Sequence, residues 1–85
     1  MYCLRIIDFY FVINIKNQEF ISAFGNSLRK LRIEAKLSQE DLANDSNIPL
    51  SQIGRIERGE INTTISTLFV LSKALNIEVK DFFDF

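Results

Sequence analysis

The chain has 85 residues, 47% of them apolar, and carries ten basic and eleven acidic side chains for a net charge of −1. The apolar content and the single proline argue against a disordered chain and indicate one small domain with a helical core. The lone Cys3 and the absence of histidine exclude an internal disulfide or a Cys/His metal site, so we expect a cytoplasmic protein without metal or cofactor.

Residues 1–16 form an apolar extension, separate from a domain predicted over residues 17–85. Isoleucine, phenylalanine, tyrosine and valine dominate this extension and favour a β-strand of about ten residues. Asp8 interrupts the apolar run and no small-residue cleavage site follows, which argues against a signal peptide. The run is also shorter than the roughly 20 apolar residues of a membrane span. A strand pair between two subunits, a tail folded onto its own domain, and a misassigned start remain open alternatives.

Residues 17–35 are predicted to form the first helix. Apolar side chains recur there at helical spacing and define an inward stripe: Phe20, Phe24, Leu28 and Leu31. Gly25 lies within the same helix, where it permits the close approach of a neighbouring helix.

Residues 38–59 are predicted to form two short helices joined by a tight turn. Ser38 is a good N-cap, and Asp41 three residues later completes a capping signature. Residues 45–47 favour a turn that ends the first of these helices. Pro49 suits the first position of the next helix, and Gly59 suits the position just after its end. A helix, a turn and a second helix with an exposed polar face make a helix-turn-helix.

Two further helices are predicted over residues 65–75 and 79–83. Thr64 is an acceptable N-cap for the longer one, and Asn76 suits its left-handed C-terminal end. Phe69 and Val70 widen the apolar face of this helix beyond what one small core needs, so we expect a subunit contact there. The residues expected to point inward are Ile65, Leu68, Leu71, Leu75, Phe82 and Phe83.

The segments LSQEDLA (37–43), IGRIERG (53–59) and LSKALNI (71–77) keep their spacing without a gap. In these segments the chain resembles the Cro/C1-type (XRE-like) helix-turn-helix family of phage repressors and bacterial regulators. The resemblance covers about residues 20–83. It implies an all-α, five-helix, lambda-repressor-like DNA-binding domain whose third helix enters the major groove.

The resemblance also implies which side chains would read base edges. The early and middle exposed positions of the third helix do this work in the family, and here they are Leu50, Ser51, Gln52, Gly54 and Arg55. A glutamine can bond adenine, an arginine can bond guanine, and a serine can serve either. Leucine can only pack against a thymine methyl, and glycine contributes no side chain. The alternative for each polar residue is a solvated surface group.

Phosphate contacts are implied at helix N-termini and in flanking loops. By position these are Gln39, Arg58, Asn62 and Thr63. The family usually has proline at the position of Thr63, so this loop is expected to be less rigid. Arg32 and Glu57 match a pair that the family uses as a structural ion pair orienting the third helix.

These observations predict a transcriptional regulator that binds double-stranded operator DNA as a homodimer. We expect it to act as a repressor. No membrane association is expected, and no nucleophile–base pair or phosphate-binding glycine loop suggests an enzyme. The alternative is a protein-interaction module, or a toxin-binding antitoxin, with weak or no DNA binding. Leu50, Gly54 and the near-neutral charge favour that alternative.

Overall fold

The computed structural model describes residues 17–85, which form four α-helices and one 3₁₀ helix, with no strand in this part of the chain. The helices are α2 (Gln18–Glu34), α3 (Gln39–Ser46), α4 (Leu50–Glu57), α5 (Ile65–Leu75) and η1 (Val79–Phe83). The predicted all-α, five-helix fold is confirmed. The strand predicted for the N-terminal extension lies outside the described residues.

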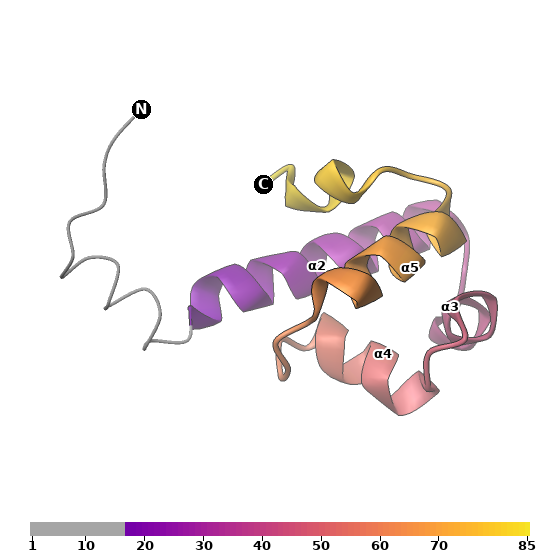
Figure 1. The fold of residues 1–85 in the computed structure, drawn as a ribbon, viewed down its shortest axis with the longest axis horizontal. Helices are drawn as coiled ribbons and strands as arrows, with labels where there is room; N and C mark the ends of the chain where they lie inside the picture. The colour runs from indigo at the N-terminus through magenta and orange to yellow at the C-terminus, as the bar shows by residue number, and fades with distance from the viewer. Residues whose placement is uncertain (1–16) are drawn as a thin grey trace, which may run out of the picture.

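The helices pack around the long α2, with the α3–α4 pair on one side of it and η1 on the other (Figure 1). Helix α3 contacts α4 and α5, α2 contacts α4 and η1, and η1 also contacts α5. One side chain from each helix is completely buried at the centre. These five are Leu28, Leu42, Ile53, Leu71 and Phe82. Their burial supplies the main favourable contribution to folding, so the core holds α3 and α4 in a fixed relation to α2.

Side-chain caps set where the helices begin. Ser38 Oγ accepts a hydrogen bond from the backbone N–H of Asp41 at 2.9 Å, and Asp41 Oδ2 accepts one from the backbone N–H of Ser38 at 2.9 Å. This is the predicted capping box. The bond from the Ser38 backbone N–H to the carboxylate, together with the nearby Ser38 hydroxyl, holds the pKa of Asp41 below its ordinary value of 3.8. Thr64 caps α5 with a single bond, in which its side-chain oxygen accepts from the backbone N–H of Thr67 at 3.2 Å.

Left-handed residues follow all four α-helices, and the end of α3 and the start of α4 differ from the prediction. Asn76 adopts φ 58° at the predicted end of α5. Helix α3 continues through the predicted turn residues Asp45 and Ser46 and ends only at Asn47, with φ 59°. The Ser46 hydroxyl donates to the Leu42 carbonyl at 2.6 Å, so its polar group is satisfied inside the helix. Pro49 was predicted to be the first residue of α4. It is instead the N-cap, and the helix starts at Leu50, because the Pro49 ψ of 141° is extended.

Two residues predicted to point inward lie at the surface. Phe20 is 50% exposed and Ile65 is 83% exposed. Each lies in the first turn of its helix, beyond the edge of the small core that residues 17–85 form. Phe20 instead stacks on Phe83, with ring centroids 5.7 Å apart.

Candidate nucleic-acid interface

Helix α4 has one buried and one exposed face. Ile53 and Ile56 are buried in the core, whereas Leu50, Ser51 and Arg55 are exposed. Gln52 is half-buried at the boundary. The four side chains assigned to base recognition therefore lie on the outer side of α4 or at its edge, as the 3.6-residue period requires.

Gly54 does not share this exposed position. It is buried, which corrects its place among the expected exposed residues of α4. A Cβ atom at Gly54 would lie 2.9 Å from Arg58 Nη1, so the arginine side chain covers the glycine. The missing side chain thus gives room to Arg58 and does not leave a gap in the exposed face.

A close approach of backbones fixes α4 on α2. A Cβ atom at Gly25 would meet the carbonyl oxygens of Ile56 and Glu57, the latter at 2.8 Å. Only glycine permits this contact, because any other residue would push the last turn of α4 away from α2. The sequence prediction of a close helix approach at Gly25 is confirmed.

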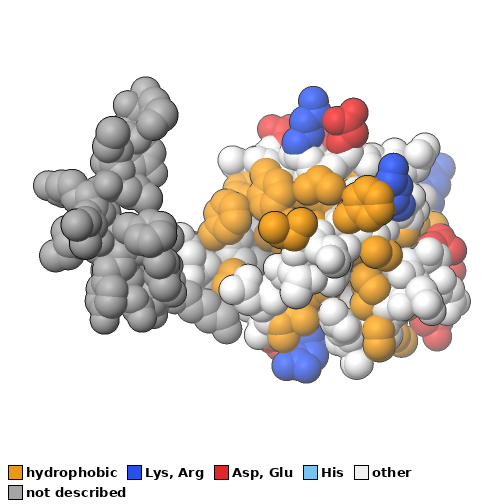
Figure 2. Space-filling model, viewed as in Figure 1, with side chains coloured by type: hydrophobic (Ala, Val, Ile, Leu, Met, Phe, Trp, Pro, Cys, Tyr) orange, Lys and Arg blue, Asp and Glu red, His pale blue; other side chains and the backbone are white. Residues whose placement is uncertain are grey.

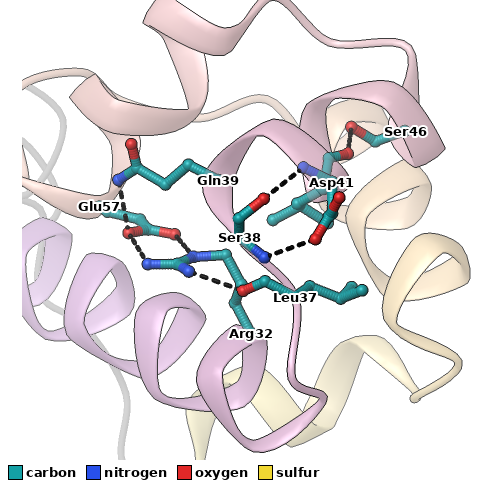
Figure 3. A network of polar contacts seen from close by, with 8 residues as sticks. Arg32, Leu37, Ser38, Gln39, Asp41, Ser46 and Glu57 are labelled. Atoms are coloured by element: carbon teal, nitrogen blue, oxygen red, sulfur yellow. Dashed lines mark hydrogen bonds and ion pairs between the residues drawn. The ribbon is translucent and has the colours of Figure 1, made fainter.

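Arg32 and Glu57 form a buried ion pair between α2 and α4 (Figure 3). Arg32 Nε lies 2.7 Å from Glu57 Oε2, and Nη2 lies 3.1 Å from Oε1. The remaining Nη1 donates to the Leu37 carbonyl at 2.8 Å, in the segment that leads to α3. Arg32 and Glu57 are only 8% and 6% exposed. Such a two-pronged pair, with its other donors satisfied, orients the helices it joins.

Gln39 joins the same network from the first position of α3. Its Nε2 donates to Glu57 Oε1 at 3.0 Å, so the side chain lies across the gap between α3 and α4 (Figure 3). An amide nitrogen carries two hydrogens, and this bond uses one of them. The network therefore positions Gln39 as well as α4.

A surface hollow of about 450 Å³ opens beside this network, between α2, α3 and α4. Its lining consists of Ser22, Asn26, Arg29, Gln39, Glu57 and Arg58. Ser22 and Asn26 were missed as candidate site residues from the sequence. Their spacing with Arg29 places all three on one polar face of α2, opposite the apolar stripe, and this spacing is the signal that could have identified them.

The end of α4 carries a second cluster of charges. Arg58 Nε lies 2.7 Å from Glu60 Oε2, and Arg55 Nε lies 3.8 Å from Glu60 Oε1. The hydrogen bond from Arg58 holds the pKa of Glu60 below its ordinary value, and the same bond raises the pKa of Arg58. Glu60 was not predicted as a site residue. The sequence shows an acid close after two arginines, but not that its carboxylate lies between them.

The backbone after α4 is fixed by a Schellman motif. Gly59 adopts φ 74°, and its N–H donates to the Ile56 carbonyl at 3.0 Å. The Glu60 N–H donates to the Arg55 carbonyl at 2.9 Å. These are the two bonds of that motif, and they confirm Gly59 as the residue that ends the helix.

Asn62 and Thr63, the last two residues assigned to phosphate contact, differ in exposure. Asn62 is exposed. The Thr63 hydroxyl oxygen is buried, and none of residues 17–85 forms a hydrogen bond with it. A phosphate contact at Thr63 would therefore use its backbone N–H or follow a rotation of the side chain.

Residues 17–85 contain no helix long and apolar enough to cross a membrane. The same residues hold no cluster of three or more histidine, cysteine, aspartate or glutamate side chains that could bind a metal ion.

Comparison with known proteins places these features in a family. Control protein C.SmaI of Serratia marcescens is 47% identical to the chain over 55 residues, which are 65% of this chain and 66% of that protein. Among solved structures, the restriction-modification controller protein C.AhdI of Aeromonas hydrophila superposes with a TM-score of 0.72 and 39% identity, over 73% of this chain and 94% of that one.

A further solved structure contains DNA. It is the tetramer of the restriction-modification controller protein C.Esp1396I in complex with its natural 35 base-pair operator. The TM-score is 0.71 and the identity 35%, over 76% of this chain and 86% of that one.

The helix-turn-helix family model HTH_3 matches residues 28–82, a range that contains α3, α4 and both partners of the buried ion pair. The chain therefore belongs to this Cro/C1-type (XRE-like) helix-turn-helix family.

Proposed function

We propose that this chain regulates transcription by binding operator DNA as a homodimer, with α4 in the major groove. The observation that carries the proposal is the fixed position of α4, whose polar outer face is held toward solvent by the Arg32–Glu57 pair and the Gly25 contact. A helix can enter the major groove and read it only if its exposed side chains are held in a definite orientation.

The outer face of α4 carries side chains that match base edges. Arg55 can donate two hydrogen bonds to guanine O6 and N7, and the Gln52 amide can pair with adenine N6 and N7. Ser51 can donate or accept, and Leu50, which is 44% exposed, can contact a thymine methyl group. In this proposal these four residues supply the sequence preference.

The hollow between α2, α3 and α4 supplies donors for a phosphate. Gln39 lies at the N-terminus of α3, where backbone N–H groups also favour an anion. The bond to Glu57 fixes the orientation of the Gln39 amide and so of its second hydrogen. Arg29 and Arg58 add positive charge to the same hollow. Asn62 and the backbone at Thr63 would add contacts beyond the end of α4.

Exposed apolar side chains support the homodimer. Phe69 is 55% exposed and Val70 is 37% exposed on α5. Figure 2 shows hydrophobic side chains gathered over the face that α5 and the C-terminal segment present to solvent. Large exposed apolar patches commonly mark contacts with another protein, and a two-fold dimer would place two copies of α4 on one face of the DNA. The relative C.Esp1396I binds its operator as a tetramer.

The proposal is tested with the full chain and a random-sequence duplex library. The purified protein should enrich one inverted repeat whose half-sites lie about 34–36 Å apart, one helical turn of DNA. Its affinity for that duplex should exceed its affinity for a scrambled duplex of the same composition by about 10³-fold or more. Equal affinity for the two duplexes would overturn the proposal and favour a protein-interaction module, an alternative that none of the relatives described above supports.

A further inference from the structure

The Glu60 carboxylate lies between the two arginines to which the proposed function gives different roles. Arg58 Nε, proposed for phosphate, is 2.7 Å from Glu60 Oε2, and Arg58 Nη2 is 3.5 Å from Oε1. Arg55, proposed for base recognition, approaches through Nε at 3.8 Å. All three side chains remain about half exposed, so a DNA backbone could reach them.

The backbone of Glu60 is held in place independently of the ion pairs. The Schellman bond from the Glu60 N–H to the Arg55 carbonyl fixes the backbone of Glu60 one turn from the Arg55 side chain. Gly59, whose positive φ makes that bond feasible, also packs closely on α2, because a Cβ there would lie 2.8 Å from Ser22 Oγ. The residue that carries the carboxylate is therefore held at the end of α4 by its backbone.

The atoms involved indicate what this arrangement does to Arg55. A guanidinium group has five N–H donors in a fixed plane, and its Nε faces a different direction from its two terminal nitrogens. Because the carboxylate lies on the Nε side of Arg55, the terminal nitrogens are left for the two acceptors of a guanine. The attraction of the carboxylate for Nε thus favours the arginine orientation that a base contact needs.

The effect on Arg58 is opposite in kind. The carboxylate already accepts its hydrogen bonds, so a DNA phosphate must compete for them. The negative charge also lowers the attraction of this end of α4 for every phosphate nearby. Because non-specific binding depends almost entirely on phosphate charge, this cost applies to any sequence.

We propose that Glu60 is a positioning residue that determines DNA specificity, by orienting Arg55 for a base and withholding Arg58 from non-specific phosphates. The inference rests on the proposed function, because it assigns a role within the same DNA-binding site. Removal of the charge should weaken the preferred complex relative to the non-specific one in two ways at once. Arg55 loses its orientation, and Arg58 becomes available to any phosphate.

The test compares the full chain with its Glu60→Gln and Glu78→Gln variants. Glu78 is a matched control, because it is also exposed, lies two residues from its cation Lys80, and belongs to the η1 end on the opposite side of α2 from α4 (Figure 1). Both variants change the net charge by the same amount. Binding is measured to the selected duplex, to single base-pair variants of it, and to a scrambled duplex, at 50 and 200 mM salt.

Glu60→Gln should bind the scrambled duplex several-fold more tightly than the wild type. This gain should be about threefold larger at 50 mM than at 200 mM salt, which corresponds to about one additional counterion released. It should also reduce discrimination at the base pair that Arg55→Ala affects, whereas Glu78→Gln should match the wild type in both respects.

Two unfavourable results are distinguishable. If the wild type prefers the selected duplex but Glu60→Gln behaves like Glu78→Gln in salt dependence and discrimination, the role of Glu60 is overturned and the proposed function stands. If the wild type shows no preference, the proposed function fails and the role of Glu60 fails with it.

Discussion

Side chains near α4 have two roles: some hold the helix in position, and others are exposed to a ligand. Arg32 and Glu57 belong to the first group, since both are buried and bonded to one another. Gln39 belongs to both, because one bond ties it to Glu57 while its position lines the polar hollow. Arg55 and Arg58 are exposed and paired with another exposed group, Glu60, so these pairs contribute little to the stability of the fold.

Removal of one partner of the buried pair should be severe. Glu57→Leu should lower the free energy of unfolding by about 3–5 kcal/mol, because Arg32 then remains buried without its carboxylate. Combining it with Arg32→Met should recover most of this loss, because an apolar pair of similar volume leaves no buried charge. Urea denaturation of the three proteins measures both effects. Equal stability of Glu57→Leu and the wild type would contradict the role assigned to the pair.

At the scale of helices, the chain relies on caps at the ends and on glycine where two backbones meet. Gly25 faces carbonyl oxygens of α4, whereas Gly54 faces only the ends of the flexible Arg58 and Gln39 side chains. The two glycines lie inside helices, but their surroundings differ in whether a neighbour can move aside.

Alanine substitutions at these glycines should therefore have opposite effects. Gly54→Ala should stabilise the fold by up to about 1 kcal/mol, because alanine favours a helix and the arginine can shift. Gly25→Ala should destabilise it by about 1–3 kcal/mol, because the added methyl group forces α2 and α4 apart. Thermal unfolding of each variant checks the signs. A stabilised Gly25→Ala variant would show that the helices are not in close contact there.

The capping box should appear in the pH dependence of stability. The pKa of Asp41 is lowered in the folded state by its bonds to Ser38, so its ionised form stabilises the fold. That contribution is complete above the ordinary value of 3.8 and is lost as the pH falls below it, through the lowered folded-state pKa. Asp41→Asn should thus be less stable than the wild type at pH 7, and the difference should shrink at acid pH. A constant difference between pH 7 and the acid limit, measured by urea denaturation, would contradict this assignment.

The sequence predicted the helices well because their ends carry strong local signals, including Ser38, Thr64, Asn76 and Gly59. It predicted the base-reading face of α4 only through its period and the family resemblance. Local patterns could not show where the core stops, which is why Phe20 was misplaced. They also could not show that Gly54 lies beneath Arg58 or that Glu60 lies between two arginines, since both depend on how side chains cross a helix end.

Taken as a whole molecule, the fold presents a polar face at α4 and an apolar face at α5 and the C-terminal segment (Figure 2). This separation suits a protein that meets DNA on one side and a second copy of itself on another. The N-terminal extension would add to the subunit contact if the predicted strand pair forms.

Disruption of the apolar face should separate the subunits without unfolding them. Phe69→Asn should convert a dimer into a monomer at micromolar concentration, because its ring is 55% exposed in the single chain. Ile33→Asn is the matched control, since Ile33 is 54% exposed on α2. Light scattering gives the mass, and circular dichroism verifies the fold. A monomeric wild type at high micromolar concentration would refute the dimer, and a chain starting at Asn14 tests the contribution of the extension.

The most direct test of the central claim, that α4 reads DNA while the surrounding residues grip its backbone, is a binding measurement on four alanine variants. Gln52→Ala and Arg55→Ala should each weaken binding to the selected duplex by about 1–3 kcal/mol and relax discrimination at one base pair. Gln39→Ala should weaken the selected and scrambled duplexes alike, and Arg58→Ala should reduce the salt dependence of binding to the selected duplex by about one counterion. If Gln52→Ala and Arg55→Ala leave the preference between the two duplexes unchanged, α4 does not read the sequence and the account is wrong.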